Sequence, residues 1–253
     1  EINNLSKFYN TSKSLFVKNK GFQALEKINL KLYKGETLGL IGESGSGKTS
    51  LSNAILKIHN FEEGEIFFNG LDISKIKGNE VLNFRKNIQI VFQDPYASLN
   101  PLHNIYQIIS EPLMFHKICR KEDLYDECKK LINDVGLSEN YLNSYPHELS
   151  GGQRQRVCIA RAISVKPQVL ICDESVSALD VSIQATVLNL LNQLKQKYSF
   201  TYIFISHDLS VVRHMSDKIL VLHNGKIVEY NDADLLFKKP KDSYTKKLIN
   251  ASL

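Results

Sequence analysis

The chain carries the octapeptide Gly42-Glu43-Ser44-Gly45-Ser46-Gly47-Lys48-Thr49, which fits the pattern G-x-x-x-x-G-K-[ST]. It follows the apolar segment Thr37–Ile41, which we predict to be a strand, and it opens Lys48–Lys57, which we predict to be a helix. Glycines in such a loop let backbone N–H groups wrap around phosphates. A chance match is the alternative, but the strand before the loop and the helix after it favour a nucleotide site.

Two side chains of this loop have separate expected roles. The ammonium group of Lys48 should reach the β- and γ-phosphates, and the hydroxyl of Thr49 should ligate Mg²⁺. The predicted nucleotide contacts are Gly42, Glu43, Ser44, Gly45, Ser46, Gly47, Lys48, Thr49 and Ser50.

Two adjacent carboxylates follow the apolar run Val169–Cys172. A buried parallel strand delivers the residues after it to the carboxyl edge of the sheet, where a phosphate-binding loop also lies. There Asp173 would hold Mg²⁺, and Glu174 would polarise the attacking water as general base. An exposed acidic pair at a strand end is the alternative, and the loop at a suitable spacing favours the catalytic interpretation.

Two further polar residues stand at the ends of predicted strands. Gln93 follows Ile88–Phe92, and its amide can both donate and accept, so it could contact Mg²⁺ or the water. His207 follows Thr201–Ser206 and could donate to a γ-phosphate, stabilising charge that develops there. Taken alone, each residue would be interpreted as an ordinary surface or structural residue.

An aromatic ring upstream of the loop could stack on adenine. Tyr9 is the predicted residue, and Phe8 and Phe16 are competing candidates that could also belong to the core.

A second anion site is predicted at Leu149-Ser150-Gly151-Gly152-Gln153, which precedes the apolar helical segment Val157–Ile163. The two glycines leave backbone N–H groups uncovered at a helix N-terminus, and Ser150 can add a hydrogen bond to a phosphate. Two phosphate-binding ends and one nucleotide predict a dimer that encloses ATP between one end of each subunit.

Strands alternate with helices, which predicts a largely parallel sheet covered on both faces. From about Asp94 to Val165 the pattern is helical, which predicts an inserted helical subdomain. Strands are also expected at Ile28–Tyr33, Gly64–Phe68, Lys218–His223 and Lys226–Tyr230, and helices at Ile105–Phe115, Glu122–Val135, Gly151–Ser164 and Ile183–Tyr198.

Composition sets limits on the function. The 253 residues are 43% hydrophobic with a net charge of +5, which fits a large core and a solvated surface with a small lysine excess. No apolar run approaches the roughly 18 residues that span a bilayer, so we expect membrane association only through partners. The four cysteines lack metal-site spacing, and Cys158 and Cys172 lie in apolar runs, which predicts core positions.

Six motifs in this order resemble those of the nucleotide-binding subunit of ATP-binding cassette (ABC) transporters. Gly42–Thr49 is similar to the Walker A motif, Val169–Glu174 to the Walker B motif and Gln93 to the Q-loop. Leu149–Gln153 resembles the signature, Ser177-Ala178-Leu179-Asp180 is similar to the D-loop, and His207 is similar to the switch histidine.

The resemblance implies an α/β fold, the P-loop NTPase ABC cassette, with a mostly parallel core sheet, an antiparallel β subdomain and an inserted helical subdomain. It implies one domain over residues 1–253, with the core and β subdomain at 1–93 and 166–253 and the helical signature subdomain at 94–165.

It also implies an ATPase coupled to transport, in which two cassettes pair head to tail. The signature of one subunit then covers the ATP bound to the other, so the residues acting on the partner's nucleotide would be Ser150, Gly151, Gly152, Gln153 and Asp180.

The segment Phe92–Pro101 is similar to the extended Q-loop of importers for dipeptides, oligopeptides and nickel. That branch implies the second, F- or E-type, ATPase of the complex. Its expected partners are a different ATPase subunit, two transmembrane permeases and an extracytoplasmic binding protein, with this chain peripheral on the cytoplasmic face of the inner membrane. Nucleic acid is not expected as a partner.

Two departures bear on the substrate. Ser175 stands where most of the family has proline, and few residues follow Tyr244. Both tilt the expected cargo from peptides toward nickel or metal chelates. The alternative function is a soluble ABC ATPase acting on nucleic acid or ribosomes, but the chain has neither a second cassette nor a long coiled-coil insertion.

Overall fold

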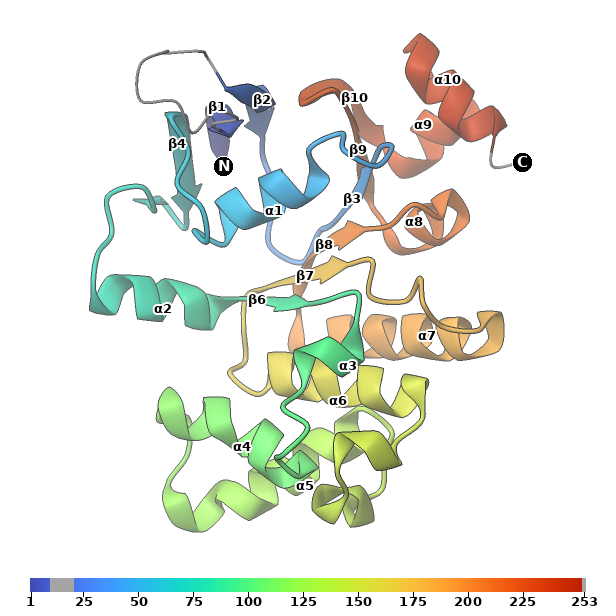
Figure 1. Cartoon of the computed structure of the whole chain (residues 1–253). Helices are drawn as coiled ribbons and strands as arrows, with labels where there is room; N and C mark the ends of the chain where they lie inside the picture. The colour runs from blue at the N-terminus through green and yellow to red at the C-terminus, as the bar shows by residue number, and fades with distance from the viewer. Residues whose placement is uncertain (10–20, 252–253) are drawn as a thin grey trace. The chain divides into compact units, whose positions relative to one another are not determined.

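The computed structural model describes residues 1–9 and 21–251, so the candidate Phe16 lies outside the described residues. The chain packs as two compact units (Figure 1). Unit 1 contains Glu1–Arg85 and Phe204–Leu253, and unit 2 contains Lys86–Ile203. The subdomain spanning 94–165 remains a prediction, and its residues all fall within unit 2.

Unit 1 includes a four-stranded sheet in the order β2-β1-β4-β5. Its pairings are antiparallel, with Ile2 of β1 opposite Leu30 of β2 and Ile66 of β4. The inward side chains of Leu5, Leu25 and Ile28 are fully buried. These strands are β1 (Ile2–Tyr9), β2 (Phe22–Leu30), β4 (Glu63–Phe68) and β5 (Leu71–Asp72).

A second group of strands in unit 1 supports the glycine-rich loop. Strand β3 (Thr37–Ile41), buried along its length, runs parallel to β9 (Lys218–His223), with Ile41 opposite Val221. Strand β10 (Lys226–Asp232) pairs antiparallel with β9, and Figure 1 shows α9 and α10 in red beside it. The helices are α1 (Lys48–Ile55), α2 (Asn79–Asn87, ending in unit 2), α8 (Leu209–Met215), α9 (Ala233–Lys238) and α10 (Ser243–Asn250).

Unit 2 contains two parallel strands and most of the helical residues. Strand β6 (Ile88–Val91) pairs with β7 (Val169–Asp173), and β8 (Thr201–Ile205) leads the chain back into unit 1. The helices are α3 (Pro95–Ser98), α4 (Ile105–Phe115), η1 (Lys121–Asp123), α5 (Leu124–Asp134), η2 (Glu139–Asn143), η3 (Pro146–Glu148), α6 (Gly151–Ile163) and α7 (Val181–Tyr198).

One predicted strand is placed wrongly. Expected at Ile28–Tyr33, it begins earlier and ends at Leu30, because a turn starts soon afterwards. The N–H of Glu36 donates to the carbonyl of Tyr33, and the Glu36 carboxylate accepts from the Tyr33 N–H. The ring of Tyr33 is 62% exposed, so it offers little apolar burial to extend the strand.

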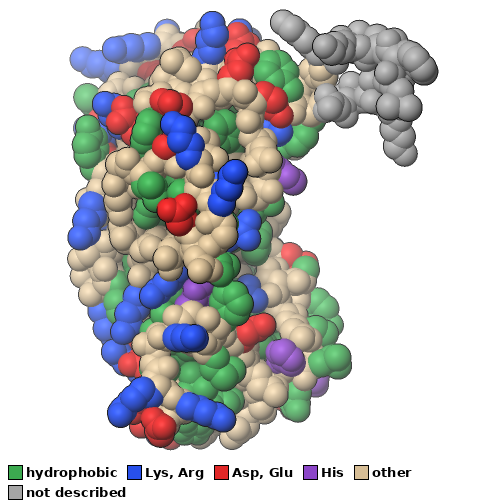
Figure 2. All heavy atoms as spheres, turned by 90° about the vertical axis from the view of Figure 1, so that its left-hand side faces the viewer, with side chains coloured by type: hydrophobic (Ala, Val, Ile, Leu, Met, Phe, Trp, Pro, Cys, Tyr) green, Lys and Arg blue, Asp and Glu red, His purple; other side chains and the backbone are tan. Residues whose placement is uncertain are grey.

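The prediction that Cys158 and Cys172 are core residues is confirmed. Burial raises the pKa of both thiols to about 12, so both stay protonated near neutral pH. Within residues 1–9 and 21–251, no helix is both long and apolar enough to cross a membrane. Figure 2 shows basic side chains spread among acidic and apolar ones on one face, which fits the modest net charge of +5.

Candidate functional site

The glycine-rich loop connects the buried strand β3 to the first turn of α1. Gly42 and Gly47 both have positive φ angles, of 153° and 110°. A Cβ on Gly42 would lie 2.2 Å from the carbonyl oxygen of Leu222, and one on Gly47 would lie 2.7 Å from that of Ala24. The loop therefore requires glycine at both positions for conformation and for space.

Lys48 is buried beneath this loop. Its ammonium group donates to the carbonyls of Gly42, at 2.7 Å, and Glu43, at 2.9 Å. The hydroxyl of Ser46 is buried without a hydrogen-bond partner among the described residues. Thr49 is exposed in the first turn of α1. A cation and a buried hydroxyl that lacks a partner suit a phosphate ligand, because a buried polar group requires a hydrogen bond.

Tyr244 is a residue at this loop that the sequence predictions missed. Its hydroxyl accepts a hydrogen bond of 3.0 Å from the backbone N–H of Glu43, 201 positions earlier. No local sequence signal could reveal a contact between residues so far apart. Burial raises the pKa of Tyr244, so the phenol stays protonated at neutral pH.

Tyr9 and His207 also lie in unit 1. The Tyr9 ring meets His59 edge-on, with centroids 6.3 Å apart, and the Lys7 amine lies 5.1 Å from its centroid. His207 is exposed after β8. The next residue, Asp208, caps α8 by accepting the N–H groups of Ser210 and Val211. Burial raises the pKa of Asp208, but hydrogen bonds, chiefly from the Ser210 hydroxyl, outweigh this and lower it overall.

In unit 2, Asp173 and Glu174 stand at the end of β7, as predicted. Glu174 has a left-handed backbone, with φ at 46°. Its carbonyl accepts two hydrogen bonds from Ser177, one from the backbone N–H at 3.1 Å and one from the hydroxyl at 2.8 Å. Its carboxylate accepts a 2.8 Å hydrogen bond from the side-chain amide of Gln93. Two of the predicted residues are therefore in contact.

The segment Ser150–Gln153 forms the N-terminus of α6, as predicted, and its cap is reciprocal. The Ser150 hydroxyl accepts the Gln153 N–H, while the Gln153 amide oxygen accepts the Ser150 N–H. The Gln153 amide nitrogen then donates to the Tyr141 hydroxyl at 2.8 Å. Because the Ser150 hydroxyl is used here as an acceptor, its proton can still be donated to a phosphate.

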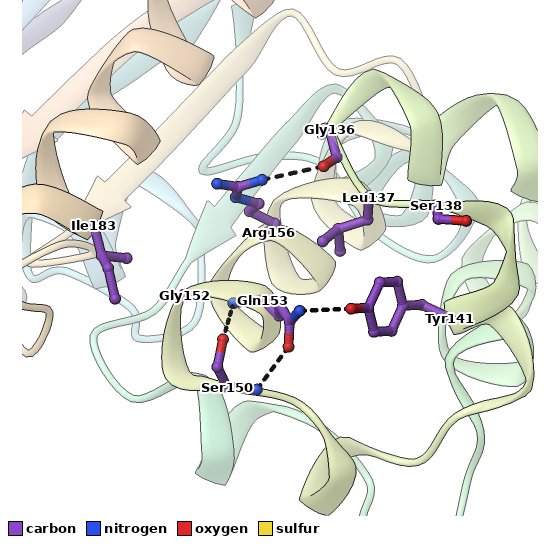
Figure 3. A pocket seen from close by; sticks show the side chains of 9 residues that line it. All are labelled: Gly136, Leu137, Ser138, Tyr141, Ser150, Gly152, Gln153, Arg156 and Ile183. Carbon is purple, nitrogen blue, oxygen red and sulfur yellow. Dashed lines mark hydrogen bonds between the residues drawn. The ribbon is translucent and has the colours of Figure 1, made fainter.

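A pocket of about 270 Å³ opens beside this cap, within unit 2 (Figure 3). Figure 3 shows Ser150, Gln153 and Tyr141 linked by hydrogen bonds along one side and Arg156 on another. The Arg156 guanidinium donates to the Gly136 carbonyl at 3.1 Å. The pocket thus combines a helix N-terminus with a cationic side chain, a combination that favours an anion.

The two glycines of α6 differ in what surrounds them. A Cβ on Gly152 would lie 2.5 Å from Cγ2 of Ile183, on α7. A Cβ on Gly151 would lie 3.8 Å from Leu179, an ordinary van der Waals contact. Gly152 is therefore needed for packing between α6 and α7, whereas a Cβ on Gly151 would cause no clash. The sequence alone predicted the same phosphate-binding role for both glycines and did not distinguish them.

Asp180 is the residue before α7 and is exposed. It lies on unit 2, as do Gln93, Asp173, Glu174 and the α6 cap, whereas the glycine-rich loop, Tyr9 and His207 lie on unit 1.

Residues 25–177 match the profile of the family described as ABC transporter, which is more than half of the chain. The chain belongs to the ABC transporter family. It is thus an ABC cassette that binds ATP and an ATPase coupled to transport. The match confirms the predicted family. Together with the relatives and solved structures described next, it confirms the predicted fold class and enzyme activity, and these relatives do not favour the alternative of an ATPase acting on nucleic acid or ribosomes.

Relatives of this ABC cassette extend the match to nearly its full length. The oligopeptide transport ATP-binding protein OppF of Streptococcus mutans is 48% identical over 252 residues, covering 99% of this chain and 80% of the relative. The dipeptide transport ATP-binding protein DppF of Lactococcus lactis is 45% identical over 255 residues, covering 99% of this chain and 80% of the relative.

Solved structures agree on the ABC fold. A dimeric post-hydrolysis state of the ATP-binding cassette MJ0796, bound to ADP and Pi, has a TM-score of 0.80 and 28% identity, covering 92% of this chain and 97% of that one. CbiO1 from Clostridium perfringens, part of the ABC transporter complex cbiONQ, has a TM-score of 0.82 and 26% identity, covering 100% of this chain and 94% of that one.

Proposed function

We propose that this chain is the ATP-hydrolysing motor of an importer for oligopeptides or dipeptides. The observation that carries the proposal is the similarity, over nearly the whole chain, to transport ATP-binding proteins for oligopeptides and dipeptides. A further relative, the glutathione import ATP-binding protein GsiA of Pectobacterium atrosepticum, is 45% identical over 90% of this chain and 37% of its own length. Glutathione is itself a tripeptide, so these relatives favour peptides over nickel or metal chelates as the cargo.

In this proposal, the glycine-rich loop holds the phosphates of ATP. The Lys48 ammonium group would exchange its bonds to the Gly42 and Glu43 carbonyls for bonds to phosphate oxygens. The buried hydroxyl of Ser46 would gain the hydrogen-bond partner that it lacks among the described residues. Tyr9 would stack on the adenine.

The residues present fit Mg²⁺, which prefers oxygen ligands. Thr49 would contribute an exposed hydroxyl, Asp173 a half-buried carboxylate and Gln93 its amide oxygen, since the Gln93 amide nitrogen is the atom that donates to Glu174. When bound, Mg²⁺ neutralises charge that develops on the phosphates.

Glu174 would accept a proton from the attacking water, and Gln93 would orient the carboxylate for this step. His207 would donate to the γ-phosphate and stabilise the charge that develops there.

The α6 cap would act on the ATP of a second cassette. The Ser150 hydroxyl proton, the N-terminus of α6 at Gly151 and the neighbouring pocket all suit an anion. Gln153 and Asp180 would complete this contact, so ATP would hold the two cassettes together, and hydrolysis would release them.

The expected partner is a different cassette, and the pair would drive two permeases. An extracytoplasmic binding protein would deliver the solute to these permeases. The chain would then lie peripherally on the cytoplasmic face of the inner membrane.

Uptake in a strain lacking this gene tests the proposal. In this strain, uptake of a labelled oligopeptide or dipeptide should be lost, while uptake of labelled nickel should not change. The wild-type gene should restore peptide uptake, and the Lys48→Ala gene should not. Restoration of nickel uptake, or peptide uptake that does not depend on Lys48, would contradict the assignment.

A further inference from the structure

Helix α10 contacts the entrance of the glycine-rich loop through Tyr244. Its hydroxyl accepts the Glu43 N–H at 3.0 Å, and its ring packs on His223, with centroids 3.8 Å apart and planes inclined by 33°. His223 is the last residue of β9, next to the strand that leads into the loop. The ring contact fixes where the hydroxyl lies.

The start of α10 is itself held by a buried carboxylate. Glu229 on β10 is only 7% exposed, and it accepts the backbone N–H groups of Lys241, at 3.1 Å, and Asp242, at 3.0 Å. The Asp242 carboxylate then caps α10 by accepting the Tyr244 N–H at 2.7 Å. The backbone of Tyr244 is therefore tied to the same strand pair that supports the loop.

A second contact holds the loop near its other end. The N–H of Gly225, in the turn between β9 and β10, donates to the Ser46 carbonyl at 2.9 Å, and the Gly225 carbonyl accepts the Glu26 N–H at 2.8 Å. The loop is thus fixed at Ser46 by this turn and at Glu43 by Tyr244. Between those two points lie exposed residues, including Gly45, where a Cβ would meet nothing within 4 Å.

We propose that Tyr244 is a positioning residue for the phosphate-binding loop, and that α10 sets the affinity of this cassette for ATP through it. The proposal rests on the nucleotide-binding role proposed for the loop. Phosphate binding requires several backbone N–H groups to converge, and a loop that is already ordered loses less conformational entropy when the nucleotide binds. Without the Tyr244 hydroxyl, the exposed Glu43 N–H would turn to water and the loop entrance would lose one anchor.

Tyr244→Phe separates positioning from folding, because it keeps the ring on His223 and removes only the hydroxyl. Tyr230→Phe is the matched control, since the Tyr230 hydroxyl donates to the Lys31 carbonyl at 3.1 Å and not to the loop. Both variants should be made in the full chain. The dissociation constant for a fluorescent ATP analogue would be measured on the subunit, and KM and kcat for ATP on the assembled transporter.

We expect Tyr244→Phe to raise both the dissociation constant and KM by about three- to tenfold, the value of one hydrogen bond, with kcat nearly unchanged. Tyr230→Phe should match the wild type in all three. Unchanged binding and KM in Tyr244→Phe, or an equal rise in Tyr230→Phe, would overturn the proposal. ATP binding that survives Lys48→Ala, in a chain otherwise of wild-type sequence, would instead contradict the role proposed for the loop.

Discussion

The side-chain amide of Gln93 donates a 2.8 Å hydrogen bond to the carboxylate of Glu174. The two residues follow neighbouring parallel strands, in which Val91 of β6 lies opposite Cys172 of β7. The backbone of Glu174 has a left-handed conformation, which costs energy for a residue with a side chain. The two hydrogen bonds that Ser177 donates to the Glu174 carbonyl stabilise this conformation. The candidate general base is therefore oriented by its neighbours.

Replacing Gln93 tests whether this orientation matters. Gln93→Ala should lower kcat for ATP by roughly tenfold, because general-base catalysis depends on a positioned carboxylate. The affinity for ATP should change little. Steady-state hydrolysis by the assembled transporter gives kcat, and equilibrium binding to the subunit gives the affinity. A kcat equal to that of the wild type would show that the Gln93 contact has no catalytic consequence.

Glu174→Gln removes the base but keeps the size of the side chain. Hydrolysis should fall by about 10²- to 10⁴-fold while ATP still binds. ATP should then hold the cassettes in a closed dimer, which light scattering detects as a doubled mass for the pair of cassettes. Free monomers at saturating ATP would count against Glu174 as the base.

Gly152→Ala should destabilise unit 2, because the new methyl group would lie 2.5 Å from Cγ2 of Ile183. Overpacking of this kind costs about 1–3 kcal/mol in the free energy of unfolding. Gly151→Ala is the control and should cost less than about 0.5 kcal/mol, since its Cβ makes an ordinary contact. Urea unfolding measures both.

A double variant checks the cause. If Gly152→Ala is destabilising because of Ile183, then adding Ile183→Ala should recover part of the loss, and the two effects should not add. Strict additivity would show that Ile183 is not the obstacle.

The lowered pKa of Asp72 predicts that the stability of the fold depends on pH. Hydrogen bonds from Lys75 and then from Ser74 lower the pKa of Asp72 from 3.8 to about 2. Because the pKa is lower in the folded chain, ionised Asp72 stabilises the fold above its unfolded pKa, and this stabilisation is lost as the pH falls through the folded pKa.

Asp72→Asn should therefore reduce the free energy of unfolding at neutral pH, and the difference from the wild type should fall by roughly half near pH 3. Urea unfolding at the two pH values tests this. A difference that stays constant with pH would mean that the Asp72 charge does not stabilise the fold.

Much of the fold could be predicted because local patterns coincide with burial. The strand Thr37–Ile41 and the helix Ile105–Phe115 have the predicted bounds. A short apolar run is typical of a buried strand, and an amphipathic repeat is typical of a helix with one buried face. Helix α2 was missed, because Phe84 is its one buried residue and the rest of the segment is mostly polar. Strand Ile28–Tyr33 was misplaced because a side chain–backbone turn at Tyr33 outweighs its apolar composition.

The candidate site was predictable where chemistry lies in contiguous motifs and not where it depends on distant contacts. The loop around Lys48 and the helix cap at Ser150 were both predicted from short contiguous motifs. The bond from Glu43 to Tyr244 spans 201 positions and gives no local signal. Likewise, the difference between Gly151 and Gly152 depends on Ile183, which a different helix supplies.

The proposed action of the α6 cap on ATP bound by the partner cassette is tested most directly by Gly151→Leu. Its side chain would stand in the first turn of α6, where a Cβ causes no clash, and far in sequence from the glycine-rich loop of its own chain. The measurement is ATP hydrolysis by the assembled transporter, using variant subunits whose ATP affinity in isolation has been determined. We predict wild-type affinity in the isolated subunit and hydrolysis reduced by at least about 100-fold in the complex. An equal loss of affinity in the isolated subunit, or unimpaired hydrolysis in the complex, would contradict this account.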